Sequence, residues 1–428
     1  MAEGNAIEHI AESGVERVVL ELVDINGISR SQQVSVEHFR ETWEDGYAYP
    51  IAIIACTPRT TPASGSGYAE RTNYADGYLR PVPETFTPVP WLPATGRVHC
   101  DLVHSDGRPV GAYPPEVLRR VLADVPEAFE FDVGSELEFH LLEESYRPVT
   151  DHDHEAVSWA TEQVAAWYAK LEEWAAVYGV PLHLMHHEYG PGQFEVLFGH
   201  GEPMAQARRA FDFKRLVKAT SRAVDKRATF MSKPFADASG NGYHLHVSLE
   251  VDGENAFADD GDLSEMGRHF VGGLLEHVDA LTALQAPTLN AFKRFEPGGF
   301  VPSTASWGVD NRMAAVRIPV GEPRIEFRLG GADANPYVVI ASTLAAGLHG
   351  IAEELEPGEP VDGDPAGERP DLLRTPELAL RALEEDDVLC EALGEAFVRA
   401  YVAVKRQELA EFRDAVTDWE REQYAEML

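Results

Sequence analysis

The sequence predicts an α+β protein with two domains, a small β-rich domain at residues 1–108 and a larger mixed domain at 109–428. Two observations predict this class. Helical periodicity occurs in six segments, the first of which begins at residue 114, and alternating strands lie between those segments. The length of 428 residues supports the division, because single domains commonly hold about 100–200 residues.

The first domain opens with a predicted strand and turn. Residues 15–23 read V-E-R-V-V-L-E-L-V, and residues 24–27, D-I-N-G, supply an aspartate and a glycine suited to a turn. Residues 55–95 are rich in Pro, Gly, Thr and Tyr and have no helical period. They are therefore expected to form an ordered connecting loop.

The larger domain alternates helices with strands. Its predicted helices are 114–124, 154–178, 203–226, 263–283, 335–354 and 386–415. Its predicted strands are 131–142, 182–187, 194–198, 243–249 and 314–329. The acidic, Pro- and Gly-rich stretch 356–370 is expected to be a solvent loop.

The charge of the chain limits its partners. The formal charge of −36, from 72 acidic and 36 basic residues, argues against nucleic acid or an anionic membrane. An alternative, disorder, is disfavoured by the 44% hydrophobic content, so we interpret the charge as adaptation to high salt. The chain has neither a leader pattern nor an apolar run of about 18 residues, and we expect a cytoplasmic protein.

Three predicted strands carry polar side chains on one face, because residues two apart on a strand point the same way. Ordinary amphipathic strands with a solvated face remain the alternative for each one taken alone. The three polar sets are Glu136 and Glu138; His244, His246 and Ser248; and Arg324, Glu326 and Arg328.

Two further features suggest what these faces bind. Glu188 and Glu195 flank a glycine-rich turn, and clustered carboxylates need a proton or a cation between them. Mg²⁺ or Mn²⁺, two or more per site, suits oxygen ligands with an occasional imidazole. Four arginines between residues 312 and 328 require an anionic ligand, so the sequence indicates phosphoryl transfer beside a carboxylate.

These motifs, in this order, resemble the glutamine synthetase family over roughly residues 131–351. They are G-S-E-L-E-F, H-H-E-x-x-x-G-Q-F-E, F-M-S-K-P-F-x-x-x-x-G-N-G-Y-H-L-H-V-S-L, N-A-F-K-R-F-x-P-G, N-R-x-x-A-V-R-I-P, R-I-E-F-R and A-N-P-Y. The resemblance implies an N-terminal β-grasp domain and a catalytic domain with a curved antiparallel sheet flanked by helices. It also implies a homo-oligomer of stacked rings, with a dodecamer as the expected size and each active site between two subunits.

The resemblance also implies a role for individual residues. One metal would be held by Glu138, Glu188 and Glu195, and the other by Glu136, His244 and Glu326. Substrate glutamate would be bound by Arg294 and Arg328, with Gly240 beside them. ATP and phosphate contacts would come from Arg312, Arg317, Arg324, His246 and Ser248, with Arg312, Arg317 and Glu326 acting in catalysis. The implied reaction joins the γ-carboxylate of glutamate to an amine through γ-glutamyl phosphate.

The chain departs from ammonia-using members of that family at one decisive position. Those members carry a glutamate on a flap that helps to deprotonate ammonium, and the matching residue here is Phe300. A phenyl ring cannot act as a base but can line a slot for an organic amine. We therefore expect a γ-glutamyl amine ligase with putrescine or a similar polyamine as acceptor. A glutamine synthetase that uses ammonia is the alternative, and a non-catalytic scaffold is a third.

Overall fold

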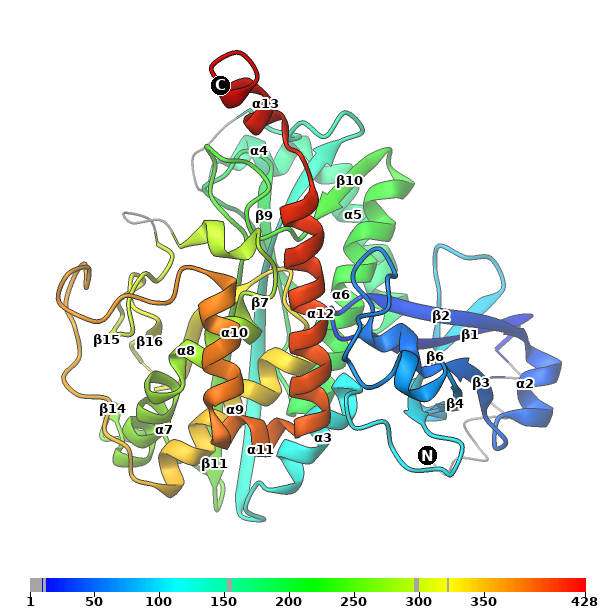
Figure 1. The fold of residues 1–428 in the computed structure, drawn as a ribbon, viewed down its shortest axis with the longest axis horizontal. Helices are drawn as coiled ribbons and strands as arrows, with labels where there is room; N and C mark the ends of the chain where they lie inside the picture. The colour runs from blue at the N-terminus through cyan, green and yellow to red at the C-terminus, as the bar shows by residue number, and fades with distance from the viewer. Residues whose placement is uncertain (1–9, 11–12, 152–155, 296–299, 322) are drawn as a thin grey trace.

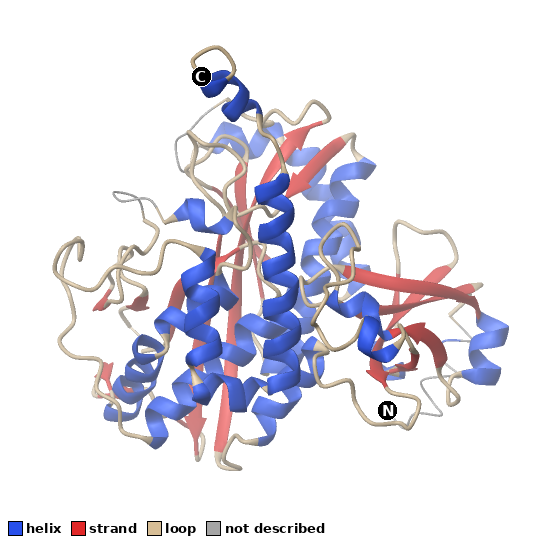
Figure 2. Ribbon diagram, in the orientation of Figure 1, coloured by secondary structure: helices blue, strands red, loops and turns tan. Residues whose placement is uncertain are grey.

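Two β-sheets organise the chain in the computed structural model, which describes all residues except 1–9, 11–12, 152–155, 296–299 and 322. The smaller sheet belongs to the N-terminal region, drawn in blue at one side of Figure 1. The larger sheet runs through the rest of the molecule, and Figure 2 shows helices standing against it. No helix among the described residues is long and apolar enough to cross a membrane.

The N-terminal sheet has the strand order β2-β1-β6-β4-β3. Its strands are β1 Arg17–Val23, β2 Ser29–Ser35, β3 Tyr47–Pro50, β4 Asp76–Pro81 and β6 Thr95–Val103, with the short β5 Thr87–Pro88 beside β6 and the helix α2 Val36–Thr42 after β2. β1 and β6 are parallel and the other pairs are antiparallel. The predicted turn is confirmed, because the Asp24 side chain accepts hydrogen bonds from the Asn26 and Ile28 amides, both at 2.9 Å.

The prediction that residues 55–95 are only a connecting loop is wrong in part. β4 and β5 lie inside this range, and β4 pairs with both β3 and β6. Gly77, Leu79 and Pro81 are buried while their neighbours are more exposed, so β4 does have the two-residue period of a strand. Its prolines and glycines concealed that period, and pairing with long-range partners decides the conformation.

The larger sheet has the order β15-β16-β17-β11-β7-β9-β8. Its strands are β7 Phe129–Glu143, β8 Leu182–His187, β9 Gln193–Phe198, β11 Gly242–Val251, β15 Trp307–Val309, β16 Val316–Ile318 and β17 Ile325–Gly331, and β10 Lys226–Thr229 and β12 Glu254–Asn255 add to β7 and β11. β15 and β16 are parallel, so the sheet is mixed where a wholly antiparallel one was expected. The single strand predicted at 314–329 is two strands, because Pro319 cannot donate to a ladder and Gly321 takes a φ of +106°.

Helices cover the larger sheet, with α6 packed on β7 and α8 on β17. The helices are α3 Pro114–Ala123, α4 Ser158–Gln163, α5 Ala165–Tyr178, α6 Pro203–Ala223, α7 Glu265–Glu276, α8 Val278–Gln285, α9 Pro336–Ala352, α10 Pro376–Glu385, α11 Asp387–Leu393, α12 Glu395–Asp414 and α13 Asp418–Tyr424. The helices predicted at 154–178, 263–283 and 386–415 are each divided, the first at Val164 and the last at Gly394, whose φ of +88° no helical residue adopts. Residues 154–155 of the first prediction lie outside the described residues. α2, α10 and α13 were not predicted.

The N-terminal sheet is joined to α6 by buried ion pairs. Arg97 of β6 contacts Asp212 of α6 and lies 3.6 Å from Glu21 of β1, while Arg215 of α6 donates to Glu21 at 2.6 Å. Arg97, Glu21 and Asp212 are all buried. Removal of one member would leave an uncompensated buried charge, so this cluster fixes the position of the N-terminal sheet against the helices.

Candidate active site

One polar cavity of about 870 Å³ gathers the residues that the sequence singled out. It lies at the face of the larger sheet where β7, β8, β9, β11 and β17 run side by side. All six predicted metal ligands line it, together with four predicted arginines and Gly240. These lining residues are Glu136, Glu138, Glu188, Glu195, His244, Glu326, Arg294, Arg312, Arg317, Arg328 and Gly240.

Strand register explains how ligands far apart in sequence meet. Glu136 pairs with His244 across β7 and β11, and Glu138 pairs with Glu195 across β7 and β9. Directly paired residues on neighbouring strands point to the same face of a sheet. Since Glu136 and Glu138 are two apart on β7, both pairs face the same cavity.

The resulting contacts are close enough to share cations. His244 Nδ1 lies 3.3 Å from Glu136 Oε2 and 3.9 Å from Glu326 Oε1, and His244 Nε2 lies 3.9 Å from Glu138 Oε1. Around these carboxylates, two groups of three described residues have ligand atoms within 4.8 Å of one another. These groups are Glu136, Glu195 and His244, and Glu136, His246 and Glu326. The donor set of carboxylates and imidazoles fits Mg²⁺ or Mn²⁺, although the geometry groups the ligands differently from the expected sets.

The electrostatics of the carboxylates support the same reading. Burial raises the pKa of Glu195 far above its usual value, and the carboxylates of Glu136 and Glu138 raise it further. Burial alone would also raise the pKa of Glu136, but hydrogen bonds with His244 and His246 hold it well below its usual range. In the absence of a cation, a proton on Glu195 relieves the repulsion among these carboxylates. Cation binding would therefore release this proton.

The arginines lie on the other side of the same carboxylates. Glu326 is buried and contacts both Arg317, at 2.7 Å, and Arg328. Burial by itself would raise the pKa of Glu326, but Arg328, His244 and His246 together outweigh it and lower the pKa. The third arginine, Arg312, makes no side-chain hydrogen bond or ion pair within the described ranges, so its guanidinium is available to an anion.

Arg294 is a buried guanidinium with an unused donor. Its Nη1 donates to the Gly330 carbonyl at 2.8 Å, while Nε is buried without a partner among the described residues. Gly240 is required beside it, because a Cβ there would lie 2.7 Å from Arg294 Cγ and 2.5 Å from the Ser232 carbonyl oxygen. This buried donor fits a carboxylate ligand.

Three predicted ATP contacts, His246, Ser248 and Arg324, are not among the residues that line the cavity. His246 nevertheless touches the site, since its Nε2 lies 2.7 Å from Glu136 Oε1. Arg324 Nε donates to His246 Nδ1 at 3.1 Å, which leaves the ring proton on Nε2 to bond Glu136. Ser248 lies two residues further along the same face of β11.

Sequence reasoning missed three side chains that shape the cavity. Gln193 donates to Glu138 Oε2 at 2.9 Å and to the Gly240 carbonyl at 3.0 Å, and Asp310 forms an ion pair with Arg317. Tyr189 packs against Phe300, with ring centroids 5.4 Å apart. Gln193 belongs to the motif H-H-E-x-x-x-G-Q-F-E, and Tyr189 occupies the first unspecified position of that motif, directly after Glu188. The available signal for both was their position beside two glutamates. Residues 296–299, the rest of the expected flap, lie outside the described residues.

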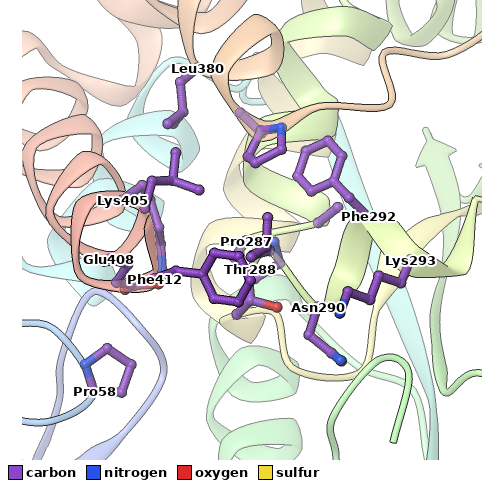
Figure 3. Close-up of a pocket in the computed structure, with 15 residues that line it drawn as sticks. Pro58, Pro287, Thr288, Asn290, Phe292, Lys293, Leu380, Lys405, Glu408 and Phe412 are labelled. Atoms are coloured by element: carbon purple, nitrogen blue, oxygen red, sulfur yellow. Dashed lines mark hydrogen bonds and ion pairs between the residues drawn. The ribbon is translucent and has the colours of Figure 1, made fainter. Parts of the chain in front are cut away.

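A second cavity, of about 380 Å³, lies near the N-terminal region and differs in character (Figure 3). Figure 3 shows Lys405, Glu408 and Phe412 entering it from α12 and Pro58 from the N-terminal loop. Most of its other walls are apolar, including Phe292 and Leu380. It contains no cluster of carboxylates or imidazoles among its lining residues and therefore is not the site of the chemistry.

Comparison with known proteins identifies the family that this site belongs to. The model of the "Glutamine synthetase, catalytic domain" family matches residues 112–424. The chain belongs to the glutamine synthetase family. Members of this family are ATP-dependent ligases that form a carbon–nitrogen bond and use divalent metals and small-molecule substrates.

Individual relatives cover the chain almost completely. Glutamine synthetase from Thermotoga maritima is 33% identical over 97% of each chain. Gamma-glutamylethanolamide synthetase from Streptomyces coelicolor is also 33% identical, over 96% of this chain and 93% of its own. The solved structure of GmaS with ADP superposes with a TM-score of 0.87 at 30% identity, covering 98% of this chain and 99% of that one. The glutamine synthetase fold thus extends over the N-terminal region as well.

Proposed function

We propose that this member of the glutamine synthetase family is a γ-glutamyl amine ligase that accepts a polyamine such as putrescine. The observation that carries the proposal is the aromatic pair Tyr189 and Phe300 at the wall of the acidic cavity. Phe300 stands where ammonia-using members have a glutamate, and half of its surface is exposed. Aromatic rings attract an alkylammonium group through their faces and shelter its methylene chain.

The residues of the cavity divide the reaction between them. Arg294 and Arg328 hold the carboxylates of glutamate. Because Gly240 has no side chain, glutamate can also approach the Gly240 backbone. Arg312 and Arg317 meet the phosphates of ATP, with Arg324, His246 and Ser248 beyond them. The six ligands Glu136, Glu138, Glu188, Glu195, His244 and Glu326 would hold Mg²⁺ or Mn²⁺, two or more per site, which supplies neutralisation of phosphate charge when bound.

The chemistry proceeds in two displacements. A γ-carboxylate oxygen of glutamate attacks the γ-phosphorus of ATP, and the bond from that phosphorus to ADP breaks. The amine nitrogen then attacks the acyl carbon (Cδ) of γ-glutamyl phosphate, phosphate leaves with the bonding electrons, and the nitrogen gives up a proton. Arg312, Arg317 and Glu326 are the catalytic residues, because the two guanidinium groups offset the charge on the transferred phosphoryl group and Glu326 positions Arg317.

The Streptomyces relative supports an amine other than ammonia, since its name denotes glutamylation of ethanolamine. The alternative, a glutamine synthetase that uses ammonia, is supported by the Thermotoga relative of equal identity. Acceptor choice therefore decides between them. A non-catalytic scaffold is the third candidate, and the retained cluster of like-charged carboxylates disfavours it, because such repulsion has no structural use.

The deciding experiment measures glutamate-dependent phosphate release from ATP with putrescine or with ammonium, at high KCl to match the predicted salt adaptation. Wild type should release phosphate with putrescine and yield γ-glutamylputrescine by mass spectrometry. Phe300→Glu should shift the putrescine-to-ammonium ratio by about tenfold toward ammonium. Phe412→Glu is the matched control, because Phe412 is equally exposed (49% against 51%) but lies on α12 outside the acidic cavity.

Two results would overturn the proposal. Faster phosphate release with ammonium than with any diamine would establish the ammonia-using enzyme. Calorimetry that detects neither nucleotide nor Mn²⁺ binding would establish the scaffold.

We also propose the arrangement that surrounds the site. Residues 1–108 form a β-grasp domain, 109–428 form the catalytic domain, and stacked rings of subunits, a dodecamer, place each cavity beside a neighbour's N-terminal domain. The five-strand order of the N-terminal sheet and the full-length match to family members support this arrangement. Light scattering on the purified protein tests it, and a monomeric mass with full activity would contradict it.

A further inference from the structure

A second charged pocket lies where the N-terminal sheet meets α6 and α12, away from the acidic cavity. It has a volume of about 650 Å³ and shares no lining residue with that cavity. We call it the basic junction pocket. Its charged lining residues are Lys214, Arg215, Lys218, Arg222 and Lys405, against the single carboxylate of Asp333.

Five cations around one small volume are unusual in a chain with twice as many acidic as basic residues. Two of the five are neutralised locally, since Arg215 bonds Glu21 at 2.6 Å and Lys405 bonds Glu408 at 3.0 Å. Within the described part of the chain, Lys218 and Arg222 have no hydrogen-bond or ion-pair partner. The pocket therefore carries a surplus of positive charge.

The arrangement on α6 is unfavourable without a ligand. Lys214, Lys218 and Arg222 follow one another at intervals of four residues and therefore stack on one face of the helix. Like charges at this spacing repel one another and destabilise a helix. An anion between the three side chains would convert this repulsion into attraction.

Lys214 is the member of the set whose charge is most costly to bury without a counter-ion. It is buried, and its Nζ donates to the Ala334 carbonyl at 2.6 Å, with no carboxylate in contact. Burial, with a smaller contribution from the neighbouring charge of Lys218, lowers its pKa to about 7. Asp333 is the nearest acid, but its two carboxylate oxygens already accept hydrogen bonds from Ser232 and Thr288.

The remaining walls suit an organic molecule. Phe230 lies beneath both lysine ammonium groups, at 5.8 Å from Lys214 and 5.7 Å from Lys218, and Trp91 lies beneath Arg215 at 5.5 Å. The pocket also adjoins the apolar cavity of Figure 3, with which it shares Pro58, Pro287, Thr288, Asn290 and Lys405. The available space thus exceeds that of a lone inorganic ion.

We propose that the basic junction pocket binds a small multivalent organic anion, bearing phosphate or carboxylate groups, at a site separate from the glutamate and ATP cavity. Lys218 and Arg222 provide the free charges, and Lys214 provides a buried one. Because the pocket is lined by the Asn26–Ser29 turn as well as by α6, the ligand would join the N-terminal sheet to the helices. The proposal stands without the assignment of the amine substrate.

The test is calorimetric titration of the full-length protein with citrate and, separately, with pyrophosphate, in buffer freed of divalent cations by a chelating resin and at ionic strength held constant with KCl. Wild type should show saturable binding of one or both probes, which distinguishes carboxylate from phosphate preference. Lys218→Gln/Arg222→Gln should weaken that binding at least tenfold. Lys226→Gln/Arg227→Gln, which removes the same charge from β10 outside the pocket, should leave it unchanged.

Two further variants locate the binding. Arg312→Gln, in the acidic cavity, should retain the wild-type affinity, and a probe-dependent change in tryptophan fluorescence should vanish in Trp91→Phe. The proposal is overturned by absence of saturable binding for both probes, by equal affinity in wild type and Lys218→Gln/Arg222→Gln, or by loss of binding in Arg312→Gln alone. None of these readouts involves turnover, so they stand apart from the test of the ligase.

Discussion

The acidic cavity and the basic junction pocket bring like charges together by different structural means. In the acidic cavity, Glu136 lies beside His244 and Glu138 beside Glu195, because residues paired across neighbouring strands point to the same face of the sheet. In the basic junction pocket, four of the five cations come from α6, three of them on one face, and Lys405 comes from α12. Cross-strand pairing fixes positions rigidly, which suits catalysis, while a pocket between the N-terminal sheet and the helices suits a ligand that joins them.

The first prediction tests the acidic cavity at its most connected residue. Glu326→Gln should lower the rate of phosphate release by roughly 10³-fold, because the neutral amide no longer orients Arg317 and Arg328 or contributes to cation binding. Glu130→Gln, exposed on the same sheet at the far end of β7, is the control and should leave the rate unchanged. Equal rates in the two variants would remove Glu326 from the site.

The two pockets also differ in how far sequence could predict them. Glu136, Glu138, His244 and Glu326 were predictable, because their spacing of two places them on single strand faces and their motifs resemble one family. Their grouping around cations was not, since it depends on the register between β7, β11 and β17. The same is true of Asp310, which reaches Arg317 only because β15 and β16 pair in parallel.

The basic junction pocket was invisible in the sequence for a different reason. Lys214, Lys218 and Arg222 have ordinary helical spacing, which usually marks a solvated face. Only the packing of the N-terminal sheet and Phe230 against this face reveals that it is enclosed. The parallel pairing of β1 with β6 and the strand at residues 76–81 were likewise decided by contacts distant in sequence.

The second prediction concerns the buried ion pairs that border the basic junction pocket. Asp212→Asn should lower the free energy of unfolding by about 3 kcal/mol, because the buried guanidinium of Arg97 loses its main counter-charge. Urea denaturation measures the change. Glu377→Gln, which breaks the exposed pair with Arg413, should change the free energy by less than about 1 kcal/mol. Similar losses in both variants would contradict the structural role of the buried cluster.

The third prediction separates the cavities by their response to cations. Mn²⁺ at about 100 times its dissociation constant should stabilise the protein by about 2.7 kcal/mol, seen as a rise in melting temperature over the protein in EDTA. Burial and neighbouring carboxylates raise the pKa of Glu195, so metal-free protein loses stability as pH rises above about 4.5, the usual glutamate value. At one fixed Mn²⁺ concentration, the rise in melting temperature should therefore be larger at pH 8 than at pH 5.5. The opposite order would contradict cation binding at Glu195.

The fourth prediction concerns the opposite sign of charge, at Lys214. Burial lowers its pKa to about 7 from 10.5, so between these values the unfolded chain holds a proton that the folded protein lacks. Stability attributable to Lys214 should therefore rise with pH in this window, by at most about 1.4 kcal/mol per pH unit. Urea denaturation at pH 7 and 9 should show this rise in wild type and a smaller one in Lys214→Met. Saturating citrate should restore the charge on Lys214 and so reduce the difference in pH dependence of stability between wild type and Lys214→Met. Identical pH dependence of the two proteins without citrate would show that burial does not hold the lysine neutral.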